Sequence, residues 1–262
     1  MKIAVSGKGG VGKSTVAAAL ALLLTKKGKR VLAVDADADA NLASALGATD
    51  SELKKIIPIS RQIALIEERT GAKVKQYGQV FNLNPDVSDI ADNYASYING
   101  VALLEIGAIE KGGSGCACPE STLLRALIAD LILYKNDMLI MDMEAGIEHL
   151  GRATARGVNL MLIVVEPGQR SLDGAHRIIE MSHDIGLKNI KLIANKVKDK
   201  NDENLLFSAF SESEYLGVIP YSEEIRQGDR TGVSVLDNLS NDLYSRFESV
   251  LTNIEKHVQN KL

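Results

Sequence analysis

The sequence predicts an α/β protein with a doubly wound, mostly parallel sheet flanked by helices. Short apolar, β-branched runs recur along all 262 residues, and stretches with helical apolar spacing lie between them. The apolar runs are nearly continuous rather than alternating with polar residues, which is typical of parallel strands covered on both faces. Repeated strand–helix–strand units of this kind bind ligands at the carboxyl ends of their strands.

The strands and main helices can be assigned in order from these patterns. Apolar runs predict strands at 2–6, 30–35, 101–106, 137–142, 159–165, 190–195 and 216–219. Helical periodicity predicts helices at 16–27, 119–134, 171–185 and 241–259. The last of these places six apolar residues on one stripe, namely Leu243, Phe247, Val250, Leu251, Ile254 and Val258. Packing against the protein surface explains that stripe, whereas a membrane-surface anchor would have a more basic polar face.

Residues 1–262 are expected to form a single domain, because no internal repeat, low-complexity tract or linker interrupts the pattern. Segment 51–100 fits least well and is interpreted as an insertion. It is expected to carry short helices around 52–57 and 88–98 and a strand at 79–83. An insertion of this size either shapes a partner or active-site surface or caps the sheet.

Composition limits the class of protein. The net charge of −4 argues against non-specific nucleic-acid binding, which needs a basic face. Apolar runs are too short to span a membrane, and Met1-Lys2 leads directly into the first strand without room for a signal peptide, so the cytoplasm is the expected location. Two cysteines cannot supply a disulfide scaffold.

The most specific motif lies directly after the first strand. Residues 7–15 read Gly7, Lys8, Gly9, Gly10, Val11, Gly12, Lys13, Ser14 and Thr15, a phosphate-binding P-loop. Its glycines let backbone N–H groups point at a polyphosphate, and the following helix directs its positive end at the same anion. We expect Lys13 to neutralise the β- and γ-phosphates and the Ser14 hydroxyl to ligate Mg²⁺.

Other strand ends carry polar residues suited to nucleotide chemistry. Asp142 ends an apolar strand, as in a Walker B motif, whose carboxylate holds the water shell of Mg²⁺. Asn195 ends another strand and offers both a donor and an acceptor to an adenine edge. No aspartate lies two places after Lys196, so the guanine-reading signature is missing and ATP is favoured over GTP.

Lys8 indicates which family of P-loop proteins the sequence resembles. The string KGGVGKST resembles the deviant Walker A ATPases, the MinD/ParA/nitrogenase-iron-protein family. The resemblance implies a homodimer in which Lys8 reaches across to the partner's nucleotide, as an arginine finger does. It also makes Asp37 the catalytic carboxylate that orients the attacking water, with Asp35 structural and near Mg²⁺.

The same resemblance assigns the remaining nucleotide contacts. Gly146, in a switch that follows Asp142, is expected to sense the γ-phosphate, and Asn195 to hold the base together with the turn around Pro220. Glu144 stands where many relatives have proline, a departure within the family.

Cys116 and Cys118 form a CxC pair in a loop at 112–119, before a helix that has Pro119 in its first turn. Two such pairs brought together by a twofold dimer would give a tetrahedral Cys₄ metal site. A redox pair or two small buried side chains are the alternative interpretations.

The stretches LLEIGAIEKGGSGCACPEST and MDMEAGIEHLGRATARGVN resemble the CooC-type nickel-maturation ATPases of carbon monoxide dehydrogenase and acetyl-CoA synthase. This resemblance implies an ATP-hydrolysing, Mg-dependent homodimer whose CxC pair binds Ni²⁺ or Zn²⁺ and whose client is a nickel enzyme.

Two rival functions share the nucleotide motifs. A MinD- or ParA-like spatial-organisation ATPase would act through membrane or DNA association, but it gives no reason for the CxC pair. An electron-transfer protein with a [4Fe–4S] cluster between subunits would take its cysteines from well-separated positions, whereas Cys116 and Cys118 are close in sequence.

Overall fold

A computed structural model describes residues 1–76, 78–107, 118–133, 138–144 and 150–261. The strands of these residues form one eight-stranded sheet in the order β3-β4-β2-β5-β1-β6-β7-β8. All neighbours pair in parallel except β3 and β4. The strands are β1 (Lys2–Ser6), β2 (Val31–Ala36), β3 (Ser96–Ile98), β4 (Val101–Glu105), β5 (Met138–Met143), β6 (Leu160–Val165), β7 (Ile190–Val197) and β8 (Tyr215–Pro220). The predicted fold class is confirmed.

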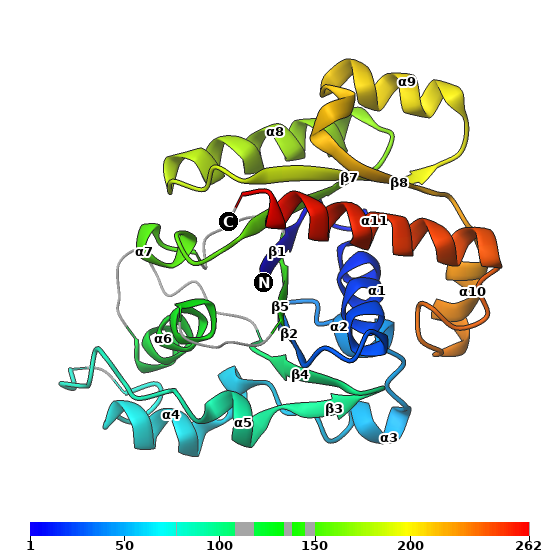
Figure 1. Cartoon of the computed structure of the whole chain (residues 1–262). Coiled ribbons are helices and arrows are strands. Elements are labelled where there is room, and N and C mark those ends of the chain that lie inside the picture. The colour runs from blue at the N-terminus through cyan, green and yellow to red at the C-terminus, as the bar shows by residue number, and fades with distance from the viewer. Residues whose placement is uncertain (77, 108–117, 134–137, 145–149, 262) are drawn as a thin grey trace.

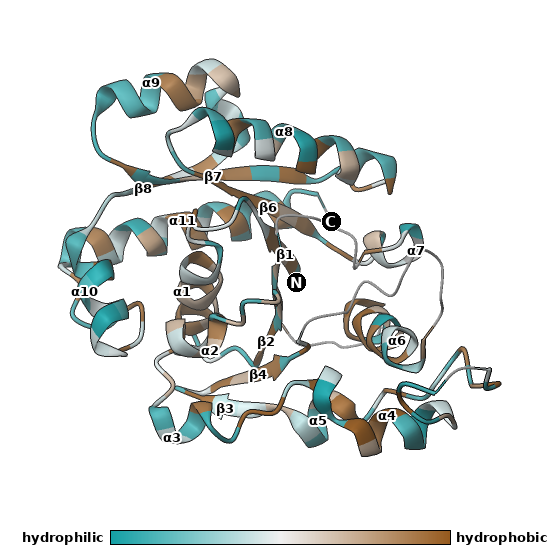
Figure 2. Ribbon diagram, turned by 180° about the vertical axis from the view of Figure 1, so that it is seen from behind, coloured by the Kyte–Doolittle hydropathy of each residue, from teal (hydrophilic) through white to brown (hydrophobic). Residues whose placement is uncertain are grey.

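Helices cover both faces of the sheet and bury an apolar core on each side (Figure 1). One face carries α1 (Lys13–Lys26), α2 (Leu42–Ala45), α10 (Glu223–Thr231) and α11 (Asn241–Gln259). The other carries α4 (Ile63–Thr70), α5 (Ile90–Tyr94), α6 (Pro119–Leu133), α7 (Arg152–Ala155), α8 (Gln169–Asp184) and α9 (Lys200–Ala209). Figure 2 shows hydrophobic residues along the central strands and on the inner sides of α1 and α6.

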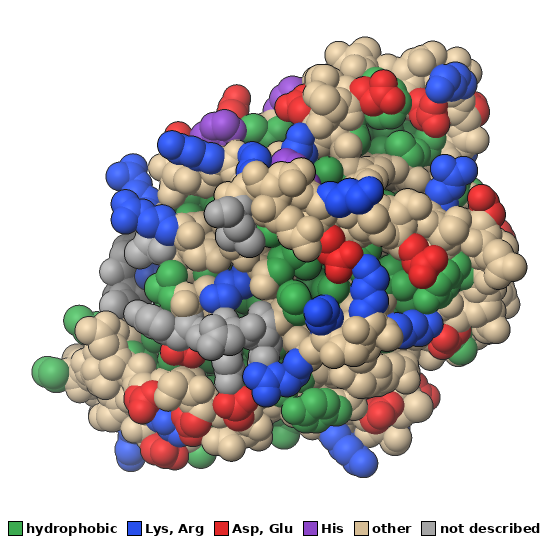
Figure 3. Space-filling model, in the orientation of Figure 1, with side chains coloured by type: hydrophobic (Ala, Val, Ile, Leu, Met, Phe, Trp, Pro, Cys, Tyr) green, Lys and Arg blue, Asp and Glu red, His purple; other side chains and the backbone are tan. Residues whose placement is uncertain are grey.

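Helix α11 has the predicted bounds, and its six-residue apolar stripe is buried. It packs against β8 and α1, so the surface-packing interpretation is confirmed. Among the described residues, no helix combines the length and apolarity needed to cross a bilayer. On the face seen in Figure 3, Lys and Arg side chains are interspersed with Asp and Glu.

The insert differs from its prediction in three respects. The helix expected around 52–57 is the shorter α3 (Asp50–Leu53), and the insert also contains the 3₁₀ helix η1 (Ile59–Arg61) and α4, neither of which was predicted. The helix expected at 88–98 is only α5, because the chain then turns into β3 and pairs with β4. The strand expected at 79–83 does not form. Residues 79–83 instead lie in a loop, where the Asn82 backbone N–H donates to the Thr70 carbonyl at the end of α4 at 2.8 Å, and Val80 is 96% exposed.

The strand order positions the site. After β1 the chain moves to β2 on one side of the sheet, and later it returns to β6 on the other side. Strand β1 therefore lies at the point where the order reverses, and ligands of doubly wound folds bind in the crevice at its carboxyl end. Residues 7–12 connect that end to α1.

Candidate nucleotide-binding site

The loop between β1 and α1 has the backbone that a phosphate cradle requires. Gly12 has φ +95°, and a Cβ there would lie 2.3 Å from Nδ2 of Asn195, so this position needs glycine. A Cβ on Gly7 would lie 2.5 Å from the Val164 carbonyl oxygen, whereas a Cβ on Gly9 would meet no described atom within 4 Å. Gly12 is the N-cap of α1, and none of the described side chains caps that end. The first N–H groups of α1 thus remain available to an anion.

Lys13 opens α1 and is almost fully buried. Its ammonium group pairs with Oδ2 of Asp37 at 3.2 Å. Asp37 follows β2, so the pair joins the P-loop to the loop that the sequence analysis assigned to the attacking water. Ser14 and Thr15 follow in the same first turn and are only partly buried.

Three carboxylates lie in register at the carboxyl ends of neighbouring strands. Asp35 on β2 is the register partner of Glu105 on β4 and of Asp142 on β5. Asp35 accepts hydrogen bonds from the backbone N–H groups of Asp37 (3.1 Å) and Leu42 (2.9 Å). Burial raises the pKa of Asp35 to about 6, although these two hydrogen bonds oppose the rise. Asp35 therefore shapes the loop after β2, consistent with the structural role predicted for it.

Asp142 is the residue best suited to a metal ion. It is fully buried, and neither carboxylate oxygen has a hydrogen-bond partner among the residues that the structure describes. Burial raises its pKa to about 7, and the nearby Ser14 hydroxyl and Lys13 oppose the rise. A buried carboxylate without partners, beside a serine hydroxyl, fits a hydrated Mg²⁺. Ser14 and Asp142 would hold this ion, which supplies positive charge to the phosphates.

Glu144 joins the segment after β5 to the loop after β2. Its Oε1 accepts a hydrogen bond from the backbone N–H of Ala38 at 3.2 Å, and its carbonyl accepts one from the Ser6 hydroxyl at 2.9 Å. The sequence analysis noted Glu144 only as a departure from proline and missed this contact. Gly146, the expected γ-phosphate sensor, lies outside the described residues.

The end of β7 also contacts the P-loop. Asn195 is 4% exposed, and its Nδ2 donates a hydrogen bond to the Val11 carbonyl at 2.8 Å. Lys196 donates to the Gly10 carbonyl through Nζ. Pro220 lies at the end of β8, in register with Val197. Asn195 and Pro220 thus occupy the same edge of the sheet, and their contact with adenine remains a prediction.

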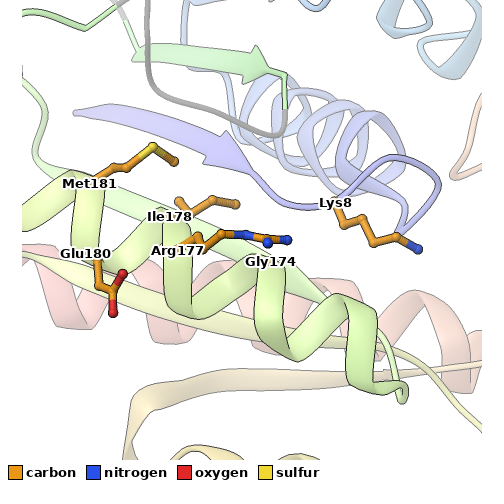
Figure 4. A pocket seen from close by; sticks show the side chains of 6 residues that line it. All are labelled: Lys8, Gly174, Arg177, Ile178, Glu180 and Met181. Carbon is orange, nitrogen blue, oxygen red and sulfur yellow. The ribbon is translucent and has the colours of Figure 1, made fainter.

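Lys8 is half-buried and faces helix α8 (Figure 4). Lys8 and five α8 residues line a hollow of about 230 Å³; the α8 residues are Gly174, Arg177, Ile178, Glu180 and Met181. Two of the six side chains are cationic and one is anionic. The reach of Lys8 toward the nucleotide of a partner subunit remains a prediction.

Cys118 directly precedes α6, and Cys116 lies outside the described residues. The Cys118 thiol donates to the Ser121 hydroxyl at 3.1 Å, and its sulfur accepts the Ser121 backbone N–H at 3.4 Å. Among the described residues, no three His, Cys, Asp or Glu side chains gather as a metal site. Metal binding by the CxC pair is therefore still a prediction.

Comparison with known proteins adds the family context. A profile described as "CobQ/CobB/MinD/ParA nucleotide binding domain" matches residues 2–235. The carbon monoxide dehydrogenase accessory protein CooC of Rhodospirillum rubrum is 44% identical over 237 residues, which cover 90% of each chain. An uncharacterized ATP-binding protein of Methanocaldococcus jannaschii is 43% identical over 259 residues, which cover 98% of each chain.

Solved structures agree on the fold. A chain of the MinC:MinD cell division protein complex from Aquifex aeolicus has a TM-score of 0.68 at 22% identity, covering 98% of this chain and 96% of that one. MinD with Mg-ADP from Pyrococcus horikoshii has a TM-score of 0.67 at 22% identity, covering 100% and 98%.

Proposed function

The chain belongs to the CobQ/CobB/MinD/ParA family as a CooC-type ATPase, and on that premise we propose that it delivers nickel to a client enzyme. In this proposal a Mg-dependent homodimer binds Ni²⁺ or Zn²⁺ through Cys116 and Cys118 at the subunit interface. The proposed client is carbon monoxide dehydrogenase, which the name of the Rhodospirillum rubrum relative contains, or acetyl-CoA synthase, which the sequence resemblance adds.

The supporting observation is where the cysteine loop leaves the sheet. Strand β4, which leads into this loop, ends beside β2, and the backbone N–H of Ile106 donates to the Asp35 carbonyl at 2.8 Å. The other end of the loop is Cys118, at the start of α6. The loop is therefore attached one strand away from the carboxylates of the nucleotide site, which favours communication between ATP and metal.

The described side chains suggest how ATP would act. Incoming phosphates compete with Asp37 for Lys13, because both are anions and the ammonium group is nearly buried. Asp37, once released, would orient water for in-line attack. Lys8 would stabilise the developing charge on the partner's nucleotide. Movement of the loop after β2, which Asp35 holds, would then shift the end of β4 and the cysteine loop. Metal release would in this way depend on the nucleotide state.

Metal titration tests the proposal. Metal-free protein is titrated anaerobically with Ni²⁺ and Zn²⁺, with and without ATP, while mass and stoichiometry are followed. We expect one metal ion per two chains and a nucleotide-dependent affinity. The Cys116→Ser/Cys118→Ser variant should lose this site and keep its ATPase activity, whereas the loop control Ser114→Ala should keep both.

Two results would contradict the proposal. Retained stoichiometry in the double cysteine variant would refute the ligand assignment. Absence of a tight metal site in every nucleotide state would favour the spatial-organisation class, which co-sedimentation with liposomes or DNA in the presence of ATP then identifies.

A further inference from the structure

We infer that Lys196 is a positioning residue that holds the P-loop in its phosphate-binding shape before ATP arrives. Its Nζ donates to the Gly10 carbonyl and lies 3.2 Å from Oε2 of Glu166. Glu166 follows β6, so the ammonium group connects the P-loop to two neighbouring strand ends.

The backbone at Lys196 is arranged for this contact. The register between β7 and β8 shifts between Ala194 and Val197, which leaves Asn195 and Lys196 in an irregular segment of the strand. Lys196 has φ +58°, in the left-handed region that residues with a Cβ seldom adopt. Consecutive side chains of a regular strand point to opposite faces, yet Asn195 and Lys196 both reach the P-loop. The irregular backbone thus makes two adjacent contacts possible.

Glu166 fixes the other side of the ammonium group. Its backbone N–H donates to the Ser171 hydroxyl at 3.0 Å, which ties the residue to the first turn of α8. Its carboxylate then offers Lys196 a second partner, so the lysine is held between a carboxylate and a carbonyl. Both the Lys196 and Glu166 side chains remain partly exposed, at 41% and 27%.

The contact matters because of how a P-loop binds phosphate. Its N–H groups turn inward to the anion, so the carbonyl groups of the same residues turn outward and need other partners. Asn195 and Lys196 provide partners for two consecutive carbonyls, those of Val11 and Gly10. A loop held in this way loses less conformational entropy when the nucleotide binds. The effect is on nucleotide affinity rather than on the chemical step.

The test compares Lys196→Ala, Lys196→Asn and Lys198→Ala. Asparagine tolerates the left-handed backbone better than most residues, so Lys196→Asn removes the ammonium group with less strain. Lys198 lies over the Tyr221 ring at 5.0 Å and makes no described contact with the P-loop, which makes it a matched control. We expect both Lys196 variants to raise the KM for ATP and the Kd for ADP about tenfold, as for loss of a hydrogen bond from a charged group. Their kcat should change less than about twofold, and Lys198→Ala should resemble the wild type.

Hydrogen exchange gives a readout besides activity. In nucleotide-free protein, the amides of residues 9–12 should exchange faster in Lys196→Asn than in Lys198→Ala. A KM change in Lys196→Ala but not in Lys196→Asn would assign the effect to backbone strain and overturn the inference. A fall in kcat with unchanged KM, or no change in either variant, would overturn it as well. If Lys196→Ala does not fold, Lys196→Asn and Glu166→Gln test the same contact.

Discussion

The carboxylate of Glu144 accepts a hydrogen bond from the backbone N–H of Ala38, with 3.2 Å between oxygen and nitrogen. The two residues are 106 positions apart and belong to the loops that follow β5 and β2. Ala38 comes directly after Asp37, whose carboxylate pairs with Lys13. The loop that carries the candidate catalytic carboxylate is therefore attached to the segment that follows Asp142.

Glu144→Ala should slow ATP hydrolysis about tenfold while changing the KM for ATP less, because it frees the loop that positions Asp37. Glu144→Gln keeps an acceptor for the Ala38 N–H and should retain most of the activity. Steady-state phosphate release measures both. Asp39→Ala, which changes an exposed acidic residue of the same loop, is the control. Equal rates for Glu144→Ala and the wild type would contradict this role.

Asp37→Asn should bind ADP more tightly and hydrolyse ATP more slowly. The Lys13 ammonium pairs with Asp37 at 3.2 Å, and phosphate has to replace that partner. A neutral amide competes less well, so the Kd for ADP should fall several-fold. Loss of a positioned carboxylate should lower kcat by about a hundredfold or more. Calorimetric titration with ADP and single-turnover hydrolysis test the two parts. Weaker ADP binding or undiminished turnover would refute the assignment.

The sequence predicted the parts of the site that local motifs specify. Lys13 and Asp142 were found because a P-loop and an apolar strand ending in aspartate each have a recognisable order of residue types. The structure places both beside Asp35, as parallel strands with a common carboxyl edge require.

Contacts between distant segments were not predictable in the same way. Asn195 and Val11 are 184 residues apart, and their hydrogen bond depends on the irregular end of β7. The 79–83 run has strand-forming residues, yet its Asn82 N–H donates to the Thr70 carbonyl rather than to a strand, and that contact depends on where α4 ends. The neighbouring residues alone therefore could not decide either feature.

The stability of the nucleotide-free protein should depend on pH through Asp142. Burial raises the pKa of this carboxyl group to about 7, so the folded protein binds the proton more tightly than the unfolded chain does. Stability is then greatest below the ordinary carboxyl pKa of about 4 and is lost as pH rises through about 7. Asp35, with its pKa raised to about 6, acts in the same direction.

Thermal unfolding of the wild type and Asp142→Asn, from about pH 5 to about pH 8, isolates this contribution. Asparagine carries no charge, so the variant should gain stability relative to the wild type as pH rises. Mg-ADP should narrow the difference at high pH, because the metal favours the ionised carboxylate that only the wild type has. Parallel curves without nucleotide would show that Asp142 is ionised throughout this range. In that case its buried oxygens, to which no described residue gives a hydrogen bond, would need another source of stabilisation.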